Sequence, residues 1–153
     1  MNLFRKIFGV LTAGIVWYLG VLLFFVFSGM QGILANPDYQ SQKFLDSFIN
    51  EPLPRASENP LLVPIGLIII GIFAGLVFYF LNDKLNYTWF KKGLIFGLIH
   101  WALMIPWFEF YLPYNVMLEP FLLVLLESFL WLCVTLLIGI YLSFVFNFKT
   151  KTS

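Results

Sequence analysis

Four long apolar runs, separated by shorter polar segments, dominate the chain. Each run is close to the ~20 residues that an α-helix needs to cross ~30 Å of hydrocarbon. The pattern therefore predicts an all-α integral membrane protein, a bundle of four transmembrane helices in one domain covering residues 1–153. We expect the four helices at about 7–28, 60–82, 92–112 and 120–147, with connecting loops at about 29–59 and 83–91.

The first loop carries a second periodic pattern. It is long for a connection between two helices, and its apolar residues between positions 38 and 50 recur at helical spacing while polar residues face away. We expect a short amphipathic helix here, between the first two transmembrane helices, on the extracytoplasmic side. It lies on the membrane surface, caps the bundle, or acts as a lid. Its apolar positions are Phe44, Leu45, Phe48 and Ile49.

Composition supports lipid as the solvent of this fold. The chain is 61% hydrophobic and 11% charged, with a mean hydropathy of +0.90, whereas soluble domains are roughly 45–50% apolar. The net charge of +1 gives no reason to expect nucleic acid as a partner. We expect the partners to be the lipid bilayer and either a second copy of the chain or another membrane protein. The single cysteine, Cys133, excludes an internal disulfide.

The basic residues are sorted to one side of the predicted membrane. Positive charges close to helix ends favour the cytoplasmic side, so both termini are predicted to be cytoplasmic, and the small size and short loops favour a bacterial inner (plasma) membrane. The opposite side has only Lys43 and Arg55, next to several acidic residues. The predicted cytoplasmic set is Arg5, Lys6, Lys84, Lys91, Lys92, Lys149 and Lys151.

Small residues recur at spacing typical of close helix packing. Glycine, serine and threonine four residues apart let two helix backbones approach each other in a membrane. We expect these residues to pack helices within the chain, with a dimer interface as the alternative. They are Gly71, Gly75, Gly93, Gly97, Thr135, Gly139 and Ser143.

Three ionisable residues within the predicted helices form the candidate polar site: Glu127, His100 and Glu109. Ionisable groups at membrane depth are costly and usually face the bundle interior. In one interpretation they form hydrogen bonds that specify helix packing, and in the other they line a polar cavity. Glu119 precedes Pro120 at the start of the fourth helix, where a carboxylate is predicted to cap the helix.

Absent motifs limit the predicted function. A single histidine excludes bis-histidine haem ligation, and there is no second histidine or cysteine to complete a zinc site. No nucleophile elbow or phosphate-binding glycine loop is present. We therefore predict no catalytic residues, no metal and no cofactor. The chain is interpreted as a non-enzymatic interaction or accessory subunit. The alternative is a small-solute or proton-coupled transporter or channel with its polar site at Glu127 and His100.

Overall fold

The computed structural model describes residues 3–50 and 58–147, and every regular element in these ranges is a helix. The predicted all-α fold is confirmed for this part of the chain. The π-helical elements η1 and η3 continue α1 and α6 without a break. The elements are α1 (Leu3–Val21), η1 (Leu22–Phe27), α2 (Met30–Leu34), α3 (Gln42–Leu45), η2 (Asp46–Asn50), α5 (Leu62–Leu81), α6 (Trp89–Glu109), η3 (Phe110–Val116) and α7 (Phe121–Asn147).

Four helical stretches are long and apolar enough to cross a membrane. They contain 24, 20, 28 and 27 residues, and a helix of 20 residues is ~30 Å long at 1.5 Å per residue. Many of their large apolar side chains are exposed on the surface of the bundle. The prediction of four membrane-spanning helices is confirmed at the level of helix length and composition. The stretches are Phe4–Phe27, Leu62–Leu81, Trp89–Val116 and Phe121–Asn147.

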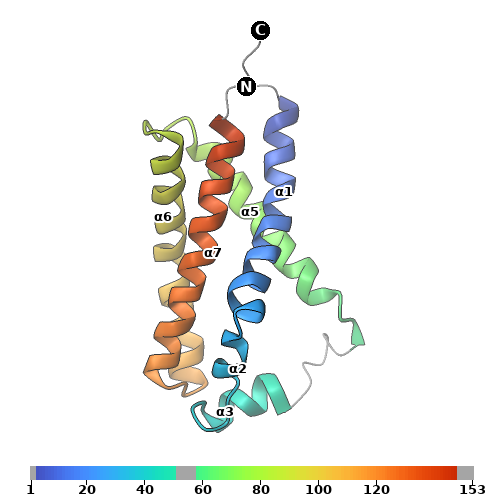
Figure 1. The fold of residues 1–153 in the computed structure, drawn as a ribbon, viewed down its shortest axis with the longest axis vertical. Helices are drawn as coiled ribbons and strands as arrows, with labels where there is room; N and C mark the ends of the chain where they lie inside the picture. The colour runs from blue at the N-terminus through green and yellow to red at the C-terminus, as the bar shows by residue number, and fades with distance from the viewer. Residues whose placement is uncertain (1–2, 51–57, 148–153) are drawn as a thin grey trace.

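The bundle has two distinct ends (Figure 1). The start of α1 and the end of α7 lie at one end, which we call the terminal end. The short helices α2 and α3 lie at the other, which we call the distal end. Residues 51–57 of the predicted first loop lie outside the described residues.

The four long helices pack as two pairs, α1 with α5 and α6 with α7, and α1 also packs against α7. Glycines lie where these backbones are closest. A methyl group added at Gly97 would lie 2.6 Å from the carbonyl oxygen of Thr135, and one added at Gly71 would lie 2.6 Å from the carbonyl oxygen of Ala13. These approaches leave no room for a side chain, so Gly71 and Gly97 lie at close helix contacts within the chain.

A buried lysine joins three helices at the terminal end. The side chain of Lys92 on α6 is 7% exposed. Its Nζ donates to the carbonyl oxygen of Asn82 at 2.8 Å, to Oδ1 of Asn82 at 3.2 Å and to Oδ1 of Asn147 at 3.3 Å. A buried ammonium group must be hydrogen-bonded, and these bonds satisfy it. They also connect the ends of α5 and α7 to the first turn of α6.

Short helices cover part of the distal end. The predicted amphipathic segment forms α3 and η2, and its Leu45 is buried whereas Phe48 and Ile49 are exposed. The hydroxyl of Ser41 accepts the backbone N–H of Phe44 at 3.1 Å and so caps α3. The same hydroxyl donates to the carbonyl oxygen of Met117 at 2.5 Å, which attaches the segment to the connection between α6 and α7.

Candidate functional site: a buried carboxyl cluster

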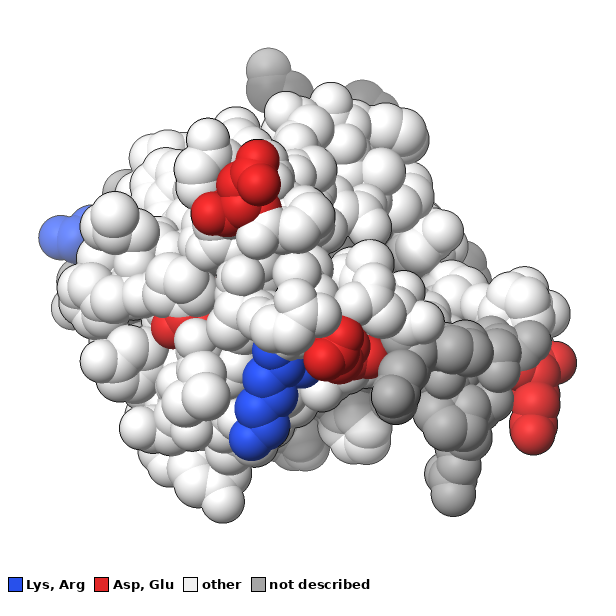
Figure 2. Space-filling view, turned by 90° about the horizontal axis from the view of Figure 1, so that it is seen from below, with Lys and Arg blue, Asp and Glu red and all other residues white. Residues whose placement is uncertain are grey.

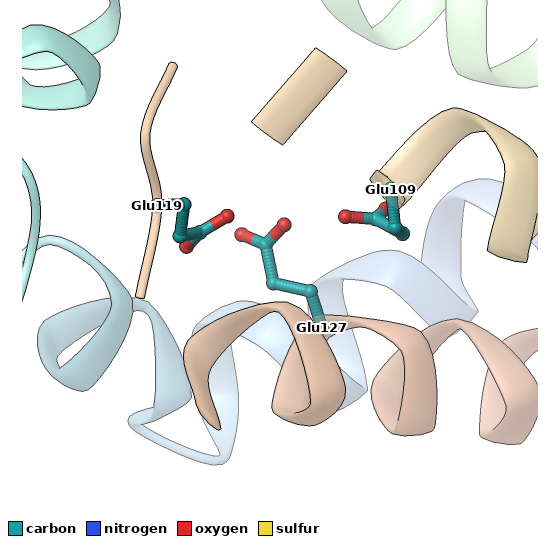
Figure 3. Close-up of side chains that lie close together, drawn as sticks. All are labelled: Glu109, Glu119 and Glu127. Atoms are coloured by element: carbon teal, nitrogen blue, oxygen red, sulfur yellow. The ribbon is translucent and has the colours of Figure 1, made fainter. Parts of the chain in front are cut away.

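Three glutamates from different parts of the chain meet at the distal end (Figure 3). Glu109 is the last residue of α6, Glu119 lies in the connection after η3, and Glu127 is in the second turn of α7. One carboxyl oxygen from each lies within 4.8 Å of those of the other two. Figure 3 shows the carboxyl group of Glu127 between those of Glu109 and Glu119. We call these three groups the carboxyl cluster.

The turn between α6 and α7 places Glu119 in the cluster. The third span ends with the π-helical η3 at Val116. Just after it, the backbone N–H of Glu119 donates to the carbonyl oxygen of Pro113 at 3.0 Å. Leu118 adopts a φ of 59°, in the left-handed region that non-glycine residues rarely occupy. This conformation directs the chain back toward α7, and the Glu119 side chain is buried as a result.

A glutamine from the first loop holds one of the three carboxyl groups. The side-chain N–H of Gln40 donates to Oε1 of Glu119 at 2.6 Å and to the carbonyl oxygen of Leu34 at 2.9 Å. Gln40 is itself only 7% exposed. The segment between α2 and α3 therefore both covers the cluster and fixes the direction of Glu119.

Most of the cluster is shielded from solvent and lacks hydrogen-bond donors. Glu109 is 1% exposed and Glu119 2% exposed, while Glu127 is partly exposed. Both carboxyl oxygens of Glu109 and Oε2 of Glu119 are buried without a hydrogen-bond partner. The indole of Trp131, one turn along α7 from Glu127, lies beside Glu109 but does not meet hydrogen-bond geometry. Buried acceptors without donors are rare, because each costs ~1–3 kcal/mol.

No basic group balances the cluster within the described residues. The polar groups that face the three carboxyls are the carboxyls themselves, Gln40 and Trp131. Seen from the distal end, charged side chains are few, and most of the described surface is uncharged (Figure 2). The cluster is thus a local concentration of acidic groups rather than part of a broad acidic surface.

The environment of Glu119 raises its pKa to about 7. Burial is the main cause, because it disfavours the charged form of a carboxyl group. The nearby charge of Glu127 adds to the increase, and the hydrogen bond from Gln40 opposes it by stabilising the carboxylate. Glu119 therefore changes its protonation state near neutral pH.

His100 lies apart from the cluster. Its ring stacks on Trp17 with centroids 5.3 Å apart, and its Nε2 lies 3.1 Å from the sulfur of Met104. The rings of Phe78 on α5 and Phe96 on α6 lie 4.9 Å apart, and His100 lines an apolar cavity of about 440 Å³ between these helices. The other lining residues are Ile70, Phe73, Ala74, Val77, Leu81, Phe96, Ile99, Leu103 and Met104.

The structure thus brings together two of the three predicted site residues. Glu127 and Glu109 share the carboxyl cluster, whereas His100 is in an apolar environment. Sequence reasoning missed Glu119 as a site residue, since its position before Pro120 is typical of a helix cap. It also missed Gln40, which is 79 residues away from its partner Glu119. The roles of these residues in function stay predictions.

Comparisons with protein-family models, with curated proteins and with solved structures found no significant match to this chain. The chemistry of the site is therefore the basis for a function. Carboxylate oxygens are hard donors that bind protons and oxygen-preferring cations. Glu109, Glu119 and Glu127 are the residues that could hold a metal ion in the described part of the chain.

Proposed function

We propose that this protein is a small integral membrane protein that binds a cation at the carboxyl cluster. The observation that carries this proposal is Glu109, which is 1% exposed, has two carboxyl oxygens without donors and lies beside Glu127. A buried carboxylate needs a donor, a cation or a proton. No donor reaches Glu109 from the described residues, so a cation or a proton is the remaining partner.

Repulsion within the cluster supports the same conclusion. Two unit charges 4.8 Å apart repel by roughly 3–4 kcal/mol at an effective dielectric constant of about 20. Three ionised carboxylates at this spacing would repel in three pairs, and no basic side chain among residues 3–50 and 58–147 contributes to the electrostatics of the cluster. A bound cation removes this repulsion.

The cation reaches the site from outside the cell in this proposal. The distribution of Lys and Arg predicts the terminal end on the cytoplasmic side, so the distal end faces outward. Glu127 is the partly exposed member of the cluster and offers the first contact to an incoming ion. Glu109 and Glu119 then hold the ion in the shielded part.

This proposal develops the alternative predicted from the sequence, a small-solute or proton-coupled transporter or channel. It moves the polar site from Glu127 and His100 to the carboxyl cluster. Cation binding is the step that a transporter, a channel and a cation sensor share. The accessory-subunit hypothesis stays a prediction, and no contact in the described residues favours it.

Neutralising Glu109 tests the proposal. We expect Glu109→Gln to raise the free energy of unfolding by about 1–3 kcal/mol in chelator-containing buffer at pH 8, because the substitution removes an uncompensated buried charge. The measurement is thermal unfolding of the full chain in detergent, compared with wild type. Acidification or added cations should then stabilise wild type more than Glu109→Gln.

The matched control is Glu58→Gln, because Glu58 is an exposed glutamate outside the cluster. We expect this variant to unfold like wild type under every condition. A Glu109→Gln protein that is less stable than wild type at pH 8 would contradict the proposal, because it would show that the carboxylate stabilises the fold without a cation.

A further inference from the structure

The oxygen atoms of the cluster resemble a ligand set for a divalent ion in number and kind. Glu109 contributes two free carboxyl oxygens, and Glu119 contributes Oε2 because Gln40 already occupies Oε1. Glu127, placed between them, adds its carboxyl group. The cluster therefore offers up to five carboxyl oxygens and includes no nitrogen or sulfur ligand.

We propose that the cation is a divalent metal ion of the calcium class, bound by Glu109, Glu119 and Glu127. This inference rests on the proposed function and names the ion that the same site takes. Ca²⁺ binds 6–8 oxygens at about 2.3–2.6 Å in flexible geometry. Two ligands on opposite sides of such an ion are about 4.6–5.2 Å apart, which accommodates oxygens that lie within 4.8 Å of one another.

Other common ions fit this arrangement less well. Zn²⁺ is usually held by histidine or cysteine, and neither is part of the cluster. Mg²⁺ demands near-ideal octahedral geometry at about 2.0–2.1 Å and keeps several water molecules. Glu109 and Glu119 are shielded from water, so an ion that exchanges its water for carboxylate oxygens is favoured. Na⁺ and K⁺ would offset one of three negative charges, whereas a divalent ion offsets two.

Gln40 is a positioning residue in this site. By donating to Oε1 of Glu119 at 2.6 Å, it holds a carboxyl group whose Oε2 has no hydrogen-bond partner. Glu119 would otherwise be free to rotate away from the ion. Partners that orient the ligands typically change metal affinity by about 10–100-fold.

Terbium luminescence tests the inference directly. Tb³⁺ replaces Ca²⁺ at oxygen sites and emits when a nearby indole transfers energy to it, and Trp131 lies beside Glu109. The full chain in zwitterionic nanodiscs should show a saturable terbium signal that Ca²⁺ displaces at lower concentration than Mg²⁺. Trp131→Phe should reduce the signal while Ca²⁺ still raises the thermal unfolding temperature.

Two cluster variants and one control complete the experiment. Glu109→Gln and Glu127→Gln should each weaken terbium binding by at least about tenfold, and Glu58→Gln should bind like wild type. Because Glu127 is partly exposed, its variant serves if Glu109→Gln fails to fold. Equal terbium binding by wild type and both cluster variants, or no saturable signal from wild type, would overturn the inference.

The outcomes separate this inference from the proposed function. If Glu109→Gln is more stable than wild type at pH 8 but no divalent ion stabilises wild type, the divalent ion is wrong and cation binding stands. If Glu109→Gln is also less stable than wild type, both proposals fail. Stabilisation of wild type by Ca²⁺ that Glu109→Gln lacks supports both.

Discussion

The three carboxyl groups are held in different ways, although they share one site. Glu119 has a donor in Gln40, Glu109 has none, and Glu127 is partly open to solvent. The first of these is the group whose protonation is easiest to follow, because its pKa of about 7 lies in an accessible range.

Glu119 makes the stability of the metal-free protein depend on pH. Its pKa is about 7 in the folded state, whereas the ordinary pKa of a glutamate is 4.5. Between these two pH values the folded chain keeps a proton that the unfolded chain loses. Stability should therefore fall as pH rises from about 4.5 through 7, and level off above that. Thermal unfolding in chelator across this range measures the effect.

The comparison with Glu119→Gln isolates this contribution. Glutamine keeps the size of the side chain and an oxygen for Gln40, but it does not titrate. The free energy of unfolding of wild type minus that of the variant should fall between pH 4.5 and 7. Glu109 and Glu127, which also face Glu119, are present in both proteins, so the subtraction reduces their contribution. An identical pH profile for the two proteins would contradict the assignment.

Sequence patterns identified two of the three acidic residues of the site but could not show that they meet. Glu109 and Glu127 were predicted as polar groups at membrane depth because a single charged residue in an apolar run is conspicuous. Glu119 lies outside the apolar runs and joins the site through the conformation of Leu118 and a hydrogen bond from Gln40. These are long-range and conformational features that periodicity does not encode.

The first and last residues of the membrane spans agree with the predicted bounds to different degrees. The second and fourth spans begin and end within two residues of the predicted bounds, because apolar length alone determines them. The third span starts at Trp89 and runs through η3 to Val116, beyond the predicted 92–112. Sequence reasoning did not predict this π-helical extension, because Pro113 and the polar Asn115 are typical of a helix end.

Glycine contacts between α6 and α7 should be sensitive to the smallest side chain. A methyl group at Gly93 would lie 2.7 Å from the Cα of Ile140, and one at Gly97 would lie 2.6 Å from the carbonyl oxygen of Thr135. Since the obstructing atoms are backbone, the helices must separate. We expect Gly93→Ala and Gly97→Ala each to lower the free energy of unfolding by about 1–3 kcal/mol.

Gly66 provides the matched control, because nothing lies within 4 Å of a methyl group added there. Gly66→Ala should leave stability unchanged or raise it slightly, since alanine favours the helix over glycine. Reversible unfolding in mixed detergent micelles gives these values. Equal losses for Gly66→Ala and Gly97→Ala would show that the close approach of α6 and α7 is not what limits stability.

At the scale of the whole molecule, the placement of charge predicts how the protein lies in the membrane. Arg5, Lys6 and Lys91 belong to the terminal end, and Lys92 is buried there against Asn82. Lys149 and Lys151, also counted in the prediction, lie outside the described residues. The structure supplies the geometry of the two ends, and the basic residues supply the expected direction.

Cysteine labelling tests this direction. In a Cys133→Ala background, a cysteine at the exposed Asp38 of the distal end should react with a membrane-impermeant maleimide added to intact cells. A cysteine at the exposed Lys84 should react only after the cells are opened. The reverse pattern would place the carboxyl cluster on the cytoplasmic side and change the source of its cation.

The close contact of Gly97 with α7 has a mechanical consequence for the far end of the same helix pair. If α6 rotates against α7 about this contact, the displacement of α6 grows with distance from it. Glu109 lies twelve residues further along α6, about 18 Å away at 1.5 Å per residue, and Pro106 removes one helical hydrogen bond on the way. A small change in the angle between the two helices would therefore alter the distance between Glu109 and Glu127 more than the distances near Gly97.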